Sequence, residues 1–194
     1  MAGLYTDGLP NLDTLFGLEQ APFDTQLASG ANPQSGSINV QELALWMSLY
    51  TDSVSGTTVA GSRYFRSIQL GYPYVANGCN IKVGGTGGTD LWSVQLWSPT
   101  GALLARSSIS SATTAGTANT WQQIAFTSTY ALTQPGTYFI GFQSNGSTAS
   151  YAAINAPSSS AILSGSATGT YASPGSITPP TAYTIAQAPK IVLY

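Results

Sequence analysis

The sequence has 194 residues and a formal net charge of −2 at pH 7, and only 6% of its residues are charged, against about 25% in an ordinary soluble domain. The length suffices for one domain with a full core, the 11% of aromatic residues argue against disorder, and no apolar run approaches the ~20 residues that span a bilayer. These totals exclude a disordered chain and a membrane protein, and they predict a β-rich globule with a neutral polar surface.

Residues 1–37 predict an extended N-terminal arm. Glycine and proline recur so often in this segment that no periodic run survives, yet the segment is more apolar than a disordered linker. It lacks the basic and apolar stretches of a signal peptide, so we expect synthesis without export. The arm is then expected to lie against its own domain or against a partner. Its candidate partner-binding residues are Asp7, Leu12, Asp13, Leu15, Phe16, Glu19, Phe23, Asp24 and Leu27.

The charges are divided unevenly along the chain. Six of the seven acidic residues lie in the first 52 residues, without any Lys or Arg among them, whereas all five basic residues follow. Two interpretations stay open: chance clustering among few charges, or an acidic arm that docks on a basic surface of its own body or of a neighbouring subunit. Five dispersed basic residues do not make the dense patch that nucleic acid needs, so no nucleic-acid partner is expected.

Residues 38–50 predict a short helix without proline or glycine. Val40, Leu43, Met47 and Tyr50 fall on one helical face. Ser37 is a suitable N-cap, which also favours a helix. A strand remains the alternative, because apolar residues alternate over part of the same segment.

Residues 57–194 predict one β domain, and its clearest part is a hairpin. Trp92, Val94 and Leu96 alternate with polar residues, as in a strand with one buried face. Ser98–Gly101 reads as a type I turn, with proline second and glycine fourth, and residues 102–109 form the return strand. The other expected strands are residues 63–70, 74–75, 81–83, 120–126, 137–143, 147–154 and 190–194.

The segments between these strands also carry predictions. Asn77-Gly78 and Asn145-Gly146 are expected to be tight turns, residues 110–119 a loop, and residues 157–189 a long excursion rich in Ser, Pro and Gly. About eight strands at this spacing predict an all-β fold, an antiparallel two-sheet sandwich that resembles a jelly roll.

The sequence contains few of the residues that usually carry out catalysis. The chain has no histidine and a single cysteine, Cys79, which removes histidine-based catalysis, zinc sites and an internal disulfide. Gly84–Gly88 lacks the ending of a phosphate loop and is read as a strand connector. Asp52 and Asp90 are the only acidic residues near the β domain and have no acidic neighbour, so Asp90 is expected to cap a turn. We expect no enzyme, no cofactor and no metal site.

The aromatic residues leave a binding function open. Trp92 and Trp97 point to opposite sides of one predicted strand, so at most one is expected in the core. Trp97, with Tyr64, Tyr72 and Tyr74 nearby, is the candidate platform for stacking a sugar ring. The competing interpretation places these rings in the core or in an oligomer interface, where aromatic residues dominate, and it is favoured.

Two sets of residues resemble structural proteins of tailed bacteriophages. Residues 24–34, followed by 41–44, resemble the start of many small proteins of that kind. The body resembles a β-sandwich module of phage virion proteins, and the matching residues are 89–92, 98–105, 121–126, 135–141 and 145–146.

This resemblance implies a virion protein of the capsid decoration (cement) type, which binds the outer surface of the phage head and stabilises contacts between major capsid proteins. The implied partners are the major capsid protein and further copies of the chain, with a trimer as the expected state. The alternative is a receptor- or glycan-binding fibre or tail module, and a tail or neck adaptor is the third possibility.

Overall fold

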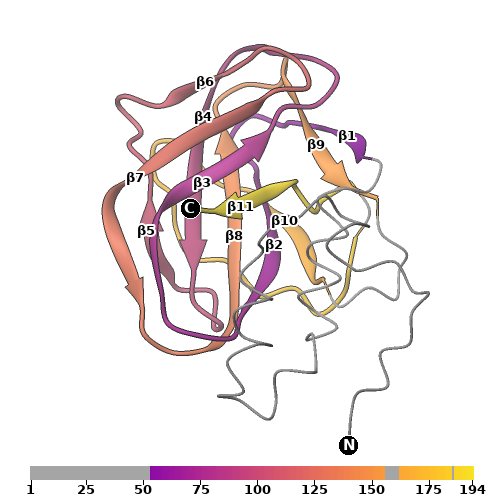
Figure 1. The fold of residues 1–194 in the computed structure, drawn as a ribbon. Coiled ribbons are helices and arrows are strands. Elements are labelled where there is room, and N and C mark those ends of the chain that lie inside the picture. The colour runs from indigo at the N-terminus through magenta and orange to yellow at the C-terminus, as the bar shows by residue number, and fades with distance from the viewer. Residues whose placement is uncertain (1–52, 156–161, 185) are drawn as a thin grey trace, which may run out of the picture. The chain divides into compact units, whose positions relative to one another are not determined.

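The computed structural model describes residues 53–155, 162–184 and 186–194, and every structural statement below concerns those residues. The predicted arm over residues 1–37, with all its candidate partner-binding residues, and the predicted helix over residues 38–50 lie outside them. The described part contains strands and no helix (Figure 1). Its eleven strands are β1 Ser53–Thr57, β2 Arg63–Leu70, β3 Tyr74–Lys82, β4 Gly88–Trp97, β5 Leu103–Arg106, β6 Thr113–Gly116, β7 Trp121–Leu132, β8 Gly136–Ser144, β9 Ser150–Ile154, β10 Ser164–Ala167 and β11 Ile191–Leu193.

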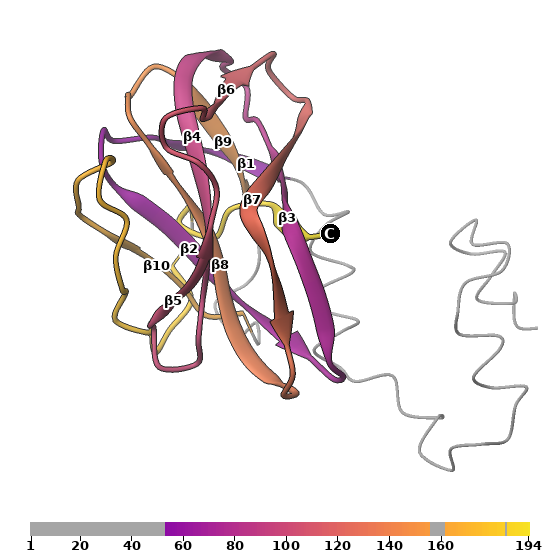
Figure 2. The ribbon, with the colours of Figure 1, turned by 90° about the vertical axis from the view of Figure 1, so that its left-hand side faces the viewer.

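The strands form an antiparallel sandwich, which confirms the predicted fold class. The larger sheet has the order β10-β2-β8-β4-β5, with β6 also paired to β4, and the smaller sheet has the order β11-β3-β7. Figure 2 shows β3 and β7 in one layer and β2, β8 and β4 in the other. β1 and β9 pair separately. Because β2 pairs with β8 while β3 pairs with β7, the pairs are nested as in a jelly roll.

The main core lies between the two layers. Aromatic side chains of the larger sheet and of β9 meet there, with the Phe142 ring 4.9 Å from the rings of Trp92 and Tyr151. Ile81 and Ile191 come from neighbouring strands of the smaller sheet and are fully buried in the same cluster. The burial of apolar surface, at about 25 cal/mol per Å², contributes most to holding these layers together.

A second apolar cluster covers the opposite side of the larger sheet. Phe65, Trp97 and Phe139 project from three of its strands and pack with Ile177, which belongs to the long C-terminal excursion. The indole Nε1 of Trp97 donates a hydrogen bond to the carbonyl of Gly175 at 2.9 Å. Trp92 and Trp97 are both 0% exposed. The prediction that at most one of them is buried was wrong, because the excursion buries the second face of this sheet.

The local sequence signals were correct at the hairpin and at β2. β2 has the predicted bounds, and β4 and β5 form the predicted hairpin. The amide of Gly101 donates to the carbonyl of Ser98 at 2.9 Å, and Gly101 has a φ of 86°, which glycine adopts without strain. The predicted loop over 110–119 contains the short strand β6, and the excursion over 157–189 contains β10.

Both Asn-Gly turns were wrongly predicted. Asn77-Gly78 lies inside the single strand β3, where the pairing with β7 shifts register between Ala76 and Gly78. Asn145-Gly146 follows β8, but β9 pairs with β1 in a different sheet and does not return along β8. The dipeptide permits a tight turn, whereas the available partner strands decide whether a hairpin forms.

Candidate functional site

The buried acidic residue Asp90 has a structural role. Its carboxylate accepts hydrogen bonds from the backbone amides of Thr148 and Ala149, at 2.7 and 2.9 Å, and from the Thr148 hydroxyl at 2.6 Å. Burial alone would raise the pKa of this carboxyl, but these hydrogen bonds outweigh it, so the pKa lies below its ordinary value. Asp90 thus ties β4 to the turn before β9, in agreement with its predicted capping role.

A buried cation links the two layers. Arg66 of β2 is fully buried and donates a hydrogen bond to the Ile191 carbonyl of β11 in the other sheet. Burial lowers its pKa to about 10. Cys79 is also fully buried, and burial raises the pKa of its thiol, although the charge of Arg66 opposes this shift. Neither group is accessible, so both serve the core and not a reaction.

The outward face of the smaller sheet is the most prominent candidate interaction surface. Alternation along each strand assigns residues to the core or to this face, and the registers align them across the sheet. The side chains that point outward, which we call the platform, are Val75, Asn80 and Lys82 of β3, Trp121, Gln123, Ala125 and Ala131 of β7, and Val192 of β11 with Tyr194 just beyond it.

Register pairs give the platform three rows. Lys82 lies opposite Trp121, which is 45% exposed. In the next row, Asn80 of the middle strand lies opposite Gln123 of β7 and, on its other side, opposite Val192 of β11.

In the third row, the Tyr194 ring lies over Gly78. A Cβ placed on this glycine would be 2.8 Å from Cε1 of the ring, so only glycine leaves room for it. Gly78 in turn pairs with Ala125 of β7. The platform therefore has an aromatic ring in each outer row and a pair of amides between them.

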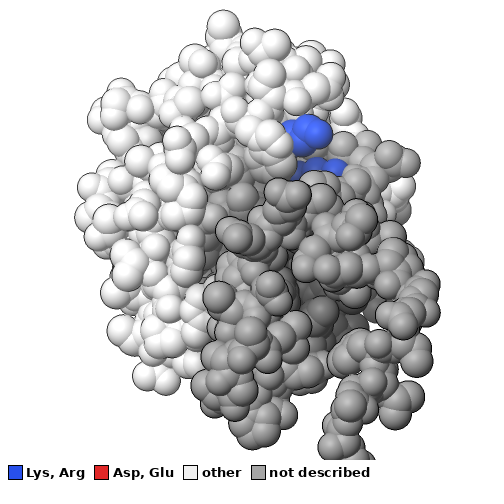
Figure 3. Space-filling view, in the orientation of Figure 1, with Lys and Arg blue, Asp and Glu red and all other residues white. Residues whose placement is uncertain are grey.

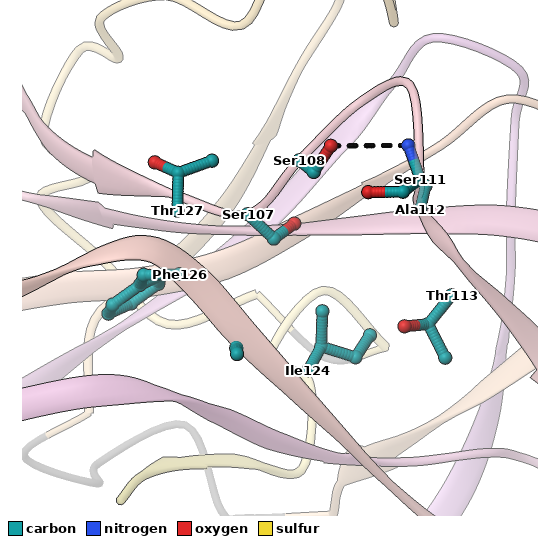
Figure 4. A pocket seen from close by; sticks show the side chains of 9 residues that line it. Ser107, Ser108, Ser111, Ala112, Thr113, Ile124, Phe126 and Thr127 are labelled. Carbon is teal, nitrogen blue, oxygen red and sulfur yellow. Dashed lines mark hydrogen bonds between the residues drawn. The ribbon is translucent and has the colours of Figure 1, made fainter.

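A small depression adjoins the same strand (Figure 4). It has a volume of about 260 Å³ and lies between Ala125–Thr127 of β7 and the Ser107–Thr113 segment. Several hydroxyls line it, but some are already engaged: the Ser107 hydroxyl donates to Ser93, and the Ser108 hydroxyl accepts from the Ser111 amide at 3.1 Å. The depression has an uncharged lining of both hydroxyl and apolar side chains, and it shares Ala125 with the platform.

Few charged side chains lie on the surface that the described residues form. The face drawn in Figure 3 shows only a small basic spot and no acidic side chain among the residues that are described. On the platform itself, Lys82 is the one charged side chain among the residues assigned to it. Such a surface suits neutral ligands or neutral protein surfaces better than highly charged partners.

The predicted sugar-stacking residues were mostly misplaced. Trp97 and Tyr64 are buried, Tyr74 is half-buried and packs against the main core, and only Tyr72 is freely exposed, at 64%. Sequence reasoning missed Trp121. The signal was present in the alternation of this strand: Ile124 and Phe126 occupy even positions and are buried, so Trp121, at an odd position, points to the other side.

No protein-family model, curated protein or solved structure matches this chain. In residues 53–155, 162–184 and 186–194, no group of three or more His, Cys, Asp or Glu side chains is placed to hold a metal ion. Across those same ranges, no helix is long and apolar enough to cross a membrane.

Proposed function

We propose that this chain is a structural virion protein of the capsid decoration type, which adheres to the outer surface of a phage head and stabilises contacts between major capsid proteins. The observation that carries the proposal is the division of charge. Residues 1–52 contain six acidic residues and no basic one, whereas residues 53–194 contain five basic residues and one acidic residue. An acidic, apolar arm joined to a β-sandwich suits a protein that anchors by its arm and presents its domain.

Adhesion by the arm would combine apolar burial with electrostatic attraction. Leu12, Leu15, Phe16, Phe23 and Leu27 would each contribute about 1.5–3 kcal/mol if fully buried, before the cost of ordering the arm. The arm carboxylates would meet basic groups of the lattice and would set register more than affinity. Repetition over a symmetric shell would add avidity. The described domain would then act as the rigid body that the arm holds in place.

Co-sedimentation with undecorated phage capsids tests the proposal. The full chain is compared with residues 38–194, and circular dichroism checks that the shortened chain keeps its β-sheet signal. We expect saturable binding of the full chain and none of the shortened one. A matched variant with Asp7, Asp13 and Asp24 changed to Asn and with Glu19 changed to Gln should bind more weakly and with less dependence on salt. If the full chain does not bind, or binds equally well without the arm, the proposal is wrong.

Adhesion to a receptor or glycan, as in a fibre or tail module, is the second candidate function. It is favoured by the platform, a sheet face that carries an exposed tryptophan and two amide side chains. In contrast to the capsid proposal, this function would depend on the β domain and would survive removal of the arm.

A further inference from the structure

We propose that the platform of the β11-β3-β7 sheet binds a neutral oligosaccharide. The inference deepens the second candidate function and rests on it, and it is independent of the capsid proposal. It is carried by the arrangement of Trp121, Asn80, Gln123 and Tyr194 on one sheet face.

The aromatic rings provide apolar contact for sugar ring faces. Trp121 is 45% exposed, whereas Trp92 and Trp97 are entirely buried. It lies outside all the apolar clusters of the domain. An exposed indole is a rigid apolar surface with a polar edge, and it suits a ligand that has an apolar face and a hydroxylated rim.

The central row provides hydrogen bonds of both kinds. Asn80 and Gln123 are direct register partners on neighbouring strands, so their side chains start about 5 Å apart on the same face. Each amide offers two N–H donors and a carbonyl acceptor. Sugar hydroxyls also donate and accept, and a pair of amides can therefore satisfy them without any charge.

The spacing of the rows indicates the size of the ligand. Trp121 and Tyr194 stand two residues to either side of the amide row and two strands apart in the sheet. With about 3.3 Å per residue and 4.8 Å per strand, the Cα atoms of the two residues lie about 16 Å from one another across the face. A single sugar ring does not reach from one to the other, so the platform fits a short chain of sugars.

The remaining residues favour a carbohydrate over a protein partner. The central part of a protein interface is usually a continuous patch of large apolar and aromatic side chains. Here the rings are separated by amides, and the apolar residues nearest to Tyr194 are the smaller side chains Ala125 and Val192. Lys82 is the one cation and no carboxylate is assigned to the face, so the face carries little charge to attract a strongly ionic partner.

The test uses the full chain on an array of neutral and acidic glycans, followed by calorimetry with the best neutral ligand. We expect Trp121→Ala to weaken binding at least tenfold, Gln123→Ala to weaken it several-fold, and Trp121→Phe to retain part of it. Tyr72→Ala is the matched control, because it removes an exposed ring outside the platform, and it should bind like the wild type. Binding should change little between low and high salt.

The possible results of this test distinguish an error in the proposed binding site from an error in the proposed glycan-binding function. If no glycan binds, the inference fails together with the glycan-binding form of the second candidate function. If a glycan binds but Trp121→Ala and Gln123→Ala leave its affinity unchanged, the adhesin function stands and the platform is not its site. Binding that appears only with acidic glycans and disappears in salt would also overturn the inference. Because Trp121 is outside the core, its variants are expected to melt like the wild type, which thermal unfolding checks.

Discussion

At the scale of single residues, Asp90 shows how a nearly uncharged domain keeps one buried carboxylate. The charge is stabilised by two backbone amides and a hydroxyl from Thr148 and Ala149. A carboxylate that accepts several hydrogen bonds needs no cation beside it. Gly146 lies so close that a Cβ there would be 2.2 Å from the carboxylate oxygen Oδ1, which fixes the turn around the acid.

Replacing this acid should destabilise the fold in a manner that depends on pH. Asp90→Asn retains the shape but places an NH₂ group against amide donors, so we expect a loss of about 1–3 kcal/mol at pH 7. The pKa of Asp90 is lowered in the folded state, so its contribution is complete above the ordinary value of about 3.9 and declines as pH falls through the folded-state pKa. Urea unfolding of the wild type and of Asp90→Asn at pH 7 and below pH 4 measures the loss of unfolding free energy and its change with pH. An equal loss at all pH values would contradict the explanation.

At the scale of elements, strand pairing decides what a local turn signal becomes. The Ser98–Gly101 turn was predicted correctly because its proline and glycine act on the chain itself, and the two strands that it joins are also partners. Asn77-Gly78 has an equally strong local signal, but the residues before and after it do not pair with each other. Both flanks of β3 pair with β7, and the second flank also pairs with β11. The same residues therefore form a bulge inside a long strand.

Gly78 should be irreplaceable at this bulge. A Cβ there would lie 2.3 Å from the Ile124 carbonyl oxygen and 2.8 Å from the Ala125 Cα, and backbone atoms cannot move aside as a side chain can. We expect Gly78→Ala to lower the free energy of unfolding by about 1–3 kcal/mol, as overpacking does. Gly85→Ala is the control, since it is exposed and its Cβ would meet only the Ser55 hydroxyl at 3.3 Å. Comparable losses in both variants would argue against a steric cause.

At the scale of the whole domain, the two sheets differ in what covers their outward faces. The excursion through Ile177 packs on the outer side of the larger sheet and creates a second apolar cluster. The outward face of the smaller sheet instead carries the exposed platform with Trp121. Among the described residues, this asymmetry separates a face that serves stability from the face on which we propose that a ligand binds.

The three described tryptophans should report this asymmetry. Trp92→Ala and Trp97→Ala remove fully buried side chains from opposite faces of the larger sheet, and each should cost about 3–5 kcal/mol. Trp121→Ala should stay within about 0.5 kcal/mol of the wild type, as is usual for a surface substitution. Chemical denaturation measures all three, and a small effect of Trp97→Ala would mean that the excursion does not seal the sheet.

The sequence by itself determined the fold class, the position of most strands and the central hairpin. Alternation and turn chemistry are properties of neighbouring residues, so they can be read without knowing the partner strands. The sequence also contained the alternation that places Trp121 on the opposite side of its strand from Ile124 and Phe126. Only the tertiary structure decided that Trp97 is buried, that the Asn-Gly pairs are not hairpins, and that Asn80, Gln123 and Tyr194 share one face. Those outcomes depend on which strands pair and which segment covers a sheet, and such contacts join residues far apart in the chain, where no local pattern specifies them.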